Sequence, residues 1–166
     1  MGTYKPPRSG SFKQKTSTKD ALNKIFRFCA YQERAHNEVK NKLFGYGLPS
    51  DEVDEILSHL IVEGFLNEER YAKAFAGGKF RILKWGKLKI QRELESLGVS
   101  SRNIKLGIAE IVMSEYSKTI LSLVRKKSSQ IKDENIFKKK NRIARFVIAK
   151  GYEPELVWET VNEFLL

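Results

Sequence analysis

Positively charged and aromatic side chains concentrate in the middle of the chain, where their types and spacing suit contact with a polyanion. Six cations fall within 14 residues, with Phe80 and Trp85 among them: Lys79, Arg81, Lys84, Lys87, Lys89 and Arg92. Lysine and arginine neutralise phosphate groups, and an aromatic ring can stack on a base. This pattern indicates a surface for DNA, or for an acidic partner that holds DNA. The alternatives are a solvated basic face, and a Trp85 ring that only packs at a helix junction.

A second basic cluster lies nearer the C-terminus and has the same two interpretations. Its candidate contact residues are Lys126, Lys127, Lys138, Lys139, Lys140 and Arg142, with Arg125 and Arg145 beside them. The chain has 31 basic and 20 acidic residues, and its net charge of +11 favours polyanionic partners. The net charge is −2 for residues 21–66, +5 for 67–113 and +4 for 114–166. The second and third parts of the chain are therefore expected to carry the contact.

The sequence offers no convincing catalytic or metal-binding set, so we predict a protein that is not an enzyme and needs no cofactor. His36 and His59 are the only histidines, and neither has a partner at metal-ligand spacing. His36 is expected at a solvated polar position. Gly77, Gly78 and Lys79 follow a helical pattern rather than opening one, unlike a phosphate-binding loop.

Several features predict a cytoplasmic protein without membrane attachment. No apolar run approaches the roughly 20 residues that span a bilayer, and the basic N-terminus lacks the apolar segment of a signal peptide. The single cysteine, Cys29, falls on an apolar helix face and is expected to be buried in a protein of a reducing compartment. Residues 1–18 are rich in Pro, Gly, Ser, Thr and Lys, and we expect a disordered basic tail there.

An internal repeat organises the chain that follows this tail. When the sequence is aligned on Gly47, Gly98 and Gly151, six apolar positions coincide three times, at glycine spacings of 51 and 53 residues. The apolar residues recur at helical spacing on both sides of each glycine, which suits a helix, a left-handed glycine turn and a second helix. A further amphipathic helix precedes each pair. The pattern predicts an all-α fold of three tandem three-helix repeats in an elongated curved array, at residues 19–66, 67–114 and 115–166.

Two details of this prediction concern single segments. Residues 126–142, KKSSQIKDENIFKKKNR, separate the first two helices of the third repeat and are expected to form a loop or a loosely held helical extension, with a candidate hinge. The repeats also resemble helix-turn-helix units in outline. Two of the three final helices begin with acidic residues, so only Arg102, Asn103 and Lys105 of the second repeat suit contact with a DNA groove.

Three strings in this order resemble the RecX family, bacterial modulators of the RecA recombinase. Residues 64–72, GFLNEERYA, are similar to the family string gyLdDeRfA, although Asn67 stands where Asp is common. Residues 86–99, GKLKIQRELESLGV, resemble G-x-x-x-I-x-x-E-L-x-x-x-G-I, with Lys-Leu-Lys in place of a Pro-Arg-Arg type of sequence. Residues 34–43 match R-x-h-s-x-x-E-L-x-x-K-L, with Val39 at a usual Leu position. The resemblance covers residues 20–113 well and the third repeat more loosely.

The resemblance implies nine helices in three repeats and a monomer that binds along the groove of the RecA–DNA filament. It also implies modulation, with inhibition expected, of the recombinase's ATP hydrolysis, strand exchange and co-protease activity. We hypothesise that the mildly acidic first repeat faces protein, while the basic repeats approach single- or double-stranded DNA. Two alternatives remain: an architectural protein that binds DNA without sequence preference and needs no recombinase, and a helical scaffold for protein interactions whose charge serves solubility.

Overall fold

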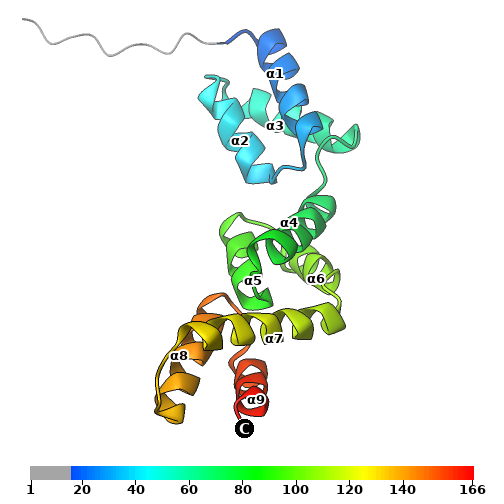
Figure 1. Cartoon of the computed structure of the whole chain (residues 1–166). Helices are drawn as coiled ribbons and strands as arrows, with labels where there is room; N and C mark the ends of the chain where they lie inside the picture. Colours follow the sequence, from blue (N-terminus) through cyan, green and yellow to red (C-terminus); the bar gives the residue numbers. More distant parts are fainter. Residues whose placement is uncertain (1–15) are drawn as a thin grey trace, which may run out of the picture.

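A computed structural model describes residues 16–166, and every regular element within them is an α-helix (Figure 1). The helices are α1 (Thr18–Tyr31), α2 (His36–Gly45), α3 (Ser50–Val62), α4 (Glu68–Leu83), α5 (Lys87–Ser96), α6 (Ser101–Ala109), α7 (Met113–Gln130), α8 (Ile136–Ala149) and α9 (Pro154–Phe164). The all-α prediction is confirmed. The expected tail lies outside the described residues apart from its last three positions, of which Thr18 already begins α1.

Polar caps and glycine turns explain where several helices begin and end. Ser17, Asn67 and Asn135 precede α1, α4 and α8, and each side chain accepts a hydrogen bond from a backbone N–H of the first turn. Two residues after its end, the second helix of every repeat is followed by a glycine with positive φ: 82° at Gly47, 76° at Gly98 and 94° at Gly151. These are the left-handed turns that the sequence predicts, because glycine adopts this conformation without steric cost.

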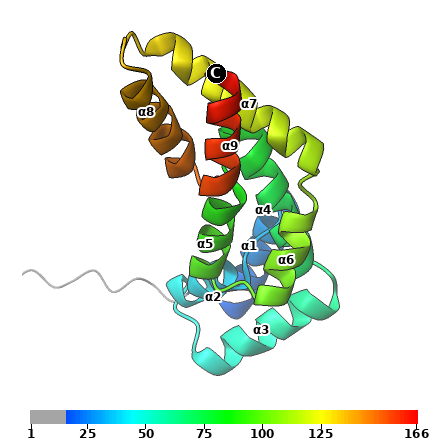
Figure 2. The ribbon, with the colours of Figure 1, turned by 90° about the horizontal axis from the view of Figure 1, so that it is seen from below.

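The three repeats follow one another along the molecule, with α1–α3 at one end and α7–α9 at the other (Figure 1). Seen along the long axis, α3 and α7 lie at opposite edges of the molecule, so the array is not straight (Figure 2). The fold is therefore the elongated curved array of helical repeats that the sequence predicts.

The same backbone position joins each repeat to the segment that precedes it. The carbonyl one residue before each turn glycine accepts a hydrogen bond from upstream in the chain. The pairs are Thr16 N–H to Tyr46 at 3.1 Å, Asn37 Nδ2 to Leu97 at 3.3 Å and Gly86 N–H to Lys150 at 2.8 Å. At the first repeat the N-terminal segment thus makes the contact that a preceding repeat makes elsewhere.

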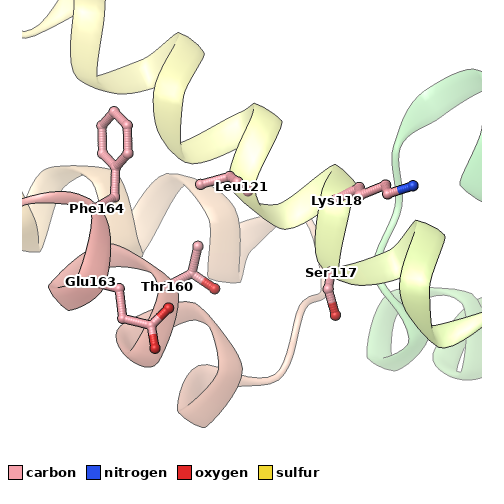
Figure 3. A pocket seen from close by; sticks show the side chains of 6 residues that line it. All are labelled: Ser117, Lys118, Leu121, Thr160, Glu163 and Phe164. Carbon is pink, nitrogen blue, oxygen red and sulfur yellow. The ribbon is translucent and has the colours of Figure 1, made fainter.

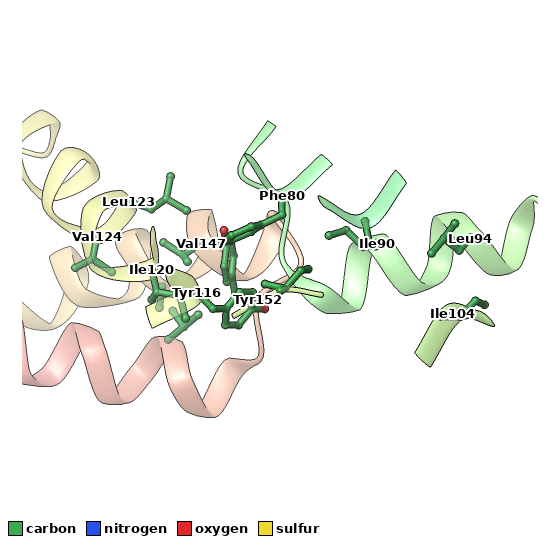
Figure 4. Close-up of a cluster of buried hydrophobic side chains, with 14 of the residues drawn as sticks. Phe80, Ile90, Leu94, Ile104, Tyr116, Ile120, Leu123, Val124, Val147 and Tyr152 are labelled. Carbon is green, nitrogen blue, oxygen red and sulfur yellow. The ribbon is translucent and has the colours of Figure 1, made fainter. Parts of the chain in front are cut away.

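Two separate hydrophobic cores hold the array together. The first lies within α1–α3 and contains Ile25, Val39, Leu43 and the buried Cys29. The second is shared by the second and third repeats (Figure 4). Aromatic rings bridge the two halves of this second core: Tyr116 lies 5.8 Å from Phe80 and 4.9 Å from Tyr152 between ring centroids. The second and third repeats therefore form one packed unit, whereas the first repeat has its own core.

The segment at residues 126–142 is mostly helical. Of the two predicted alternatives, a loop is therefore wrong and a helical extension is confirmed. Residue Gln130 ends α7, Ile136 begins α8, and only residues 131–135 lie between them. Ile131 is buried against the shared core, and Asn135 caps α8. The apolar anchor and the cap explain why this charged stretch is ordered.

Candidate nucleic-acid interface

The basic segment between α4 and α5 is organised around the Trp85 side chain. The half-buried ring packs against the shared core, and two ammonium groups lie over it, Lys79 Nζ at 5.1 Å and Lys89 Nζ at 4.3 Å from the ring centroid. Cation–π attraction holds both side chains at the surface beside the ring. Trp85 is therefore a packing residue that also positions two cations, and its stacking on a base stays a prediction.

Hydrogen bonds with residues of the third repeat fix the backbone of this segment. Lys84 adopts a left-handed conformation, with φ of 55°, and its carbonyl accepts a hydrogen bond from Tyr152 Oη at 3.0 Å. Leu88 N–H donates to the Gly151 carbonyl at 3.0 Å. Lys84, and with it the cations that flank it in α4 and α5, thus lies at a junction between repeats rather than on a free loop.

Tyr116 completes this junction from α7. Its hydroxyl accepts a hydrogen bond from Lys87 N–H at 2.9 Å and donates one to Glu153 Oε2 at 2.6 Å. Burial and the Glu153 hydrogen bond both raise the pKa of Tyr116 far above its usual range. The hydroxyl is therefore protonated under all physiological conditions and keeps both hydrogen bonds.

The six basic residues around the junction of α4 and α5 lack acidic partners in the described part of the chain, unlike Arg70 and Lys73 earlier in α4. Within residues 16–166, no carboxylate forms an ion pair with Lys79, Arg81, Lys84, Lys87, Lys89 or Arg92. The first repeat differs, because Arg34 pairs with Glu38 at 3.0 Å and Lys40 with Asp54 at 3.1 Å. The positive charge of these six residues is therefore not paired with carboxylates and is available to a polyanion.

Cations recur at matching positions of the second and third repeats. Lys89 and Arg92 of α5 correspond, 53 residues further on, to Arg142 and Arg145 of α8. The equivalent residues of α2 are Glu38 and Asn41, so the first repeat lacks this pair. Arg92, Arg142 and Arg145 are all exposed. Two consecutive repeats thus carry the same basic helix face, and the first repeat does not.

The other predicted contact residues of the third repeat are less uniform. Lys126 and Lys138 are exposed, whereas Lys139 is half-buried. Lys127 Nζ lies 4.8 Å from the Phe146 ring centroid, and Lys140 Nζ donates to Asn162 Oδ1 at 3.2 Å. Arg142 has a long ion pair of 3.8 Å with Asp133. These residues share one end of the molecule but do not form a single cluster.

On α6 the predicted groove-contact residues separate into two kinds. Arg102 and Lys105 are exposed, away from the junction between α4 and α5. Asn103 instead donates from its amide to Glu68 Oε2 at 2.6 Å, which makes it a structural residue. Burial tends to raise the pKa of Glu68, but hydrogen bonds from Ser100 and Asn103 outweigh burial and lower it. Asn103, one of the three predicted groove-contact residues, therefore joins α6 to α4.

The described residues contain no arrangement suited to catalysis or metal binding. No group of three or more His, Cys, Asp or Glu side chains could hold a metal ion in this part of the chain. A depression between α7 and α9 is lined by Ser117, Lys118, Leu121, Thr160, Glu163 and Phe164, without a nucleophile and base in contact (Figure 3). The prediction for His36 is wrong: the side chain is half-buried, and its Nε2 is enclosed without a hydrogen-bond partner. Its position beside Ala35, which joins the shared core, explains the burial.

Sequence reasoning missed the residues that position the cations. Nothing in the spacing of Tyr116 and Tyr152 indicates hydrogen bonds to the segment between α4 and α5. The charge of the segment is visible in the sequence, but its attachment to another repeat depends on tertiary contacts 29 to 68 residues apart.

Comparisons with known proteins agree with this architecture. Residues 67–106 match the family model for the second three-helix domain of RecX, and residues 114–161 match that for its third. A protein of Geobacillus kaustophilus (strain HTA426) named "Regulatory protein RecX" is 30% identical over 84% of this chain, which spans 52% of that relative's length. Another of that name from Prosthecochloris aestuarii (strain DSM 271 / SK 413) is 23% identical over 90% of this chain and 97% of its own.

The solved structures show the same fold. The crystal structure of RecX from Lactobacillus salivarius aligns with a TM-score of 0.80 at 20% identity, over 89% of this chain and 96% of that one. A second crystal structure, of a regulatory protein RecX, aligns with a TM-score of 0.79 at 16% identity, over 88% of this chain and 71% of that one. No helix of the described residues is long and apolar enough to cross a membrane. The two domain matches together cover more than half of the 166 residues, and the chain belongs to the RecX family.

Proposed function

We propose that this chain regulates the RecA recombinase by binding along the RecA–DNA filament, and that it inhibits the recombinase's ATP hydrolysis, strand exchange and co-protease activity. Membership of a family whose relatives are named regulatory proteins supports the regulatory role. One structural observation carries the proposed mode of binding. It is the group of cations around the junction of the second and third repeats, namely Lys79, Arg81, Lys84, Lys87, Lys89 and Arg92, which form no ion pair with a carboxylate of the described residues.

The distribution of charge supports a division of labour along the array. The second and third repeats present the matching pairs Lys89 with Arg92 and Arg142 with Arg145, which suit contacts with successive phosphates. The first repeat has its own core and neutralises several of its cations internally. It is suited to contact with the recombinase protein rather than with DNA. An elongated array can reach both components of a helical filament.

The test compares two sets of variants in the full chain. The first replaces Lys84, Lys87, Lys89 and Arg92 with Gln, and the second replaces the exposed Asp51 and Glu55 of α3 with Lys. We expect the first set to weaken binding to the RecA filament and to flatten its salt dependence, by up to about 0.7 in the log–log slope for each lost phosphate contact on single-stranded DNA. We expect the second set to weaken filament binding with little change in the slope. Equal losses and equal slopes from both sets would reject the division.

A second candidate function is DNA binding without a recombinase, and the unpaired cations alone favour it. The two functions differ in their ATPase readout. A regulator changes RecA-catalysed ATP hydrolysis on single-stranded DNA at concentrations below those that coat naked DNA. An architectural DNA-binding protein affects hydrolysis only once it competes for the DNA itself. Titration of the chain into both assays at one salt concentration distinguishes them.

A further inference from the structure

A basic depression lies where α7 ends beside α8, at the far end of the array from the first repeat. Its lining residues are Lys127, Gln130, Ile131, Lys132, Arg142 and Arg145, and its volume is about 520 Å³. Four of these six residues are cations. The depression is separate from the junction between α4 and α5, and it adds Lys132 to the contact residues proposed above.

Part of the depression is built by the residues by which the third repeat exceeds the other two. Lys127, Gln130, Ile131 and Lys132 lie at the end of α7 and in the link after it, whereas Arg142 and Arg145 occupy positions that α5 also has. Helix α7 has 18 residues, against 14 in α1 and 16 in α4, and α8 has 14 against 10 in both α2 and α5. The buried Ile131 anchors the link between the lengthened helices, and Asn135 caps α8. The site is thus a defined structure of the third repeat.

The cations of the depression have little negative charge to balance them. Within the described residues, the only ion pair among them joins Arg142 to Asp133 at 3.8 Å. Cations at a helix C-terminus also favour the helix dipole, which accounts for Lys127 in the last turn of α7. It does not account for Arg142 and Arg145, which lie in the interior of α8. Mutual repulsion among four cations is relieved when an anion binds between them.

We propose that this depression binds phosphate groups of a nucleic acid backbone, as a second contact point on the same strand that meets α5. The proposal rests on the proposed function, because it needs DNA at the basic repeats. Arg142 and Arg145 occupy the positions of Lys89 and Arg92 one repeat earlier, so a long polyanion that follows the array meets cations at both. Arginine suits this role because its planar guanidinium binds phosphate through two hydrogen bonds.

The test removes two cations of the depression that are not among the residues replaced to test the proposed function. The double variant Lys132→Gln/Arg145→Gln is compared with Lys19→Gln/Arg27→Gln on α1, which removes the same two charges from exposed positions of the first repeat. Binding of oligodeoxythymidylate is measured at several salt concentrations. We expect the depression variant to lose affinity and to flatten the log–log salt slope by about 1.4, or about 0.7 for each contact. The α1 variant should leave the slope unchanged.

Two results overturn the proposal: equal behaviour of the depression variant and the α1 variant, and equal affinities for phosphate and oligonucleotide. Neither of these two results rejects the proposed function. If the depression variant and the α1 variant behave alike while the variant with Lys84, Lys87, Lys89 and Arg92 replaced by Gln loses DNA binding, the depression has no role and the proposed function stands. If that four-residue variant also binds DNA normally, the proposed function itself fails. A third measurement titrates inorganic phosphate against the backbone amide resonances of residues 127–145. We expect millimolar phosphate to be needed where micromolar oligonucleotide suffices, and equal affinities would assign the site to a small free anion instead.

Discussion

Gly86 and Gly151 touch backbone to backbone at the junction of the second and third repeats. Gly86 N–H donates to the carbonyl of Lys150 at 2.8 Å, and a Cβ atom on Gly86 would overlap the carbonyl of Gly151. Ala35 occupies the position of Gly86 in the first repeat and is buried against the second. Small residues at this position therefore suit the contact between one repeat and the next, and at Gly86 the turn of the next repeat leaves no room for a Cβ atom.

Replacing Gly86 with Ala should separate the second and third repeats. The added methyl group meets backbone atoms, which cannot rotate away as a side chain can, so we expect a loss of about 1–3 kcal/mol in the free energy of unfolding. Gly78→Ala is the matched control, because a Cβ there meets nothing within 4 Å. In the interior of α4 it should stabilise the protein by about 0.5–1 kcal/mol. Urea denaturation measures both changes, and equal effects would contradict the assigned contact.

Removing the Tyr116 hydroxyl should destabilise the same junction by a different route. In Tyr116→Phe the ring and its contacts remain, but Lys87 N–H loses its acceptor and Glu153 its donor. An unsatisfied buried polar group costs about 1–3 kcal/mol, so we expect a loss of that size in the free energy of unfolding. A loss indistinguishable from zero would show that water replaces the hydroxyl. Tyr31→Phe is the control, because Tyr31 is 83% exposed at the end of α1.

Because the first repeat has its own core, we expect a destabilising substitution in that core to loosen the first repeat alone. Leu43 and Leu94 are equivalent positions of the first and second repeats, and both are fully buried. Each Leu→Ala change should cost about 2–5 kcal/mol locally. Hydrogen exchange should show faster exchange confined to residues 16–66 for Leu43→Ala, and spread over the second and third repeats for Leu94→Ala. Exchange that rises throughout the chain in both variants would mean that all three repeats unfold together.

The helices and turns of this fold were predictable because they depend on local sequence. The three glycines with positive φ follow apolar residues at helical spacing, and a left-handed turn there is a matter of backbone sterics. The division into two cores was not predictable, since the apolar pattern is the same in all three repeats. It depends on which side chains bridge adjacent repeats, and Phe80, Tyr116 and Tyr152 bring large rings together at the junction of the second and third repeats.

The candidate interface was predictable in charge but not in arrangement. A cluster of cations is visible in the sequence, and so is the preference for the second and third repeats. The burial of His36, the engagement of Asn103 with Glu68 and the ordered link around Ile131 all arise from contacts between distant segments. His and Asn side chains are solvated in most proteins, and Ile131 lies within a strongly charged stretch. Composition and periodicity alone therefore give the wrong environment for all three.

Glu68 should make the second repeat sensitive to acid. Its carboxylate accepts hydrogen bonds from the Ser100 hydroxyl at 2.6 Å and from the Asn103 amide at 2.6 Å, which tie the start of α4 to that of α6. Despite partial burial, these bonds lower the pKa of Glu68 below its ordinary value of 4.5. Because the folded-state pKa is depressed, the carboxylate stabilises the fold fully above pH 4.5, and this contribution disappears as the pH falls through the folded-state pKa.

We therefore expect Glu68→Gln to lower the free energy of unfolding by about 1–3 kcal/mol at pH 7, since the hydrogen bonds to a charged acceptor are weakened or lost. The difference from the unmodified chain should shrink at pH 3, where Glu68 itself approaches protonation. Urea unfolding at both pH values measures this change, with the exposed Glu55→Gln as the control. A difference that stays constant between pH 7 and pH 3 would mean that the ionised carboxylate does not contribute to the contact between α4 and α6.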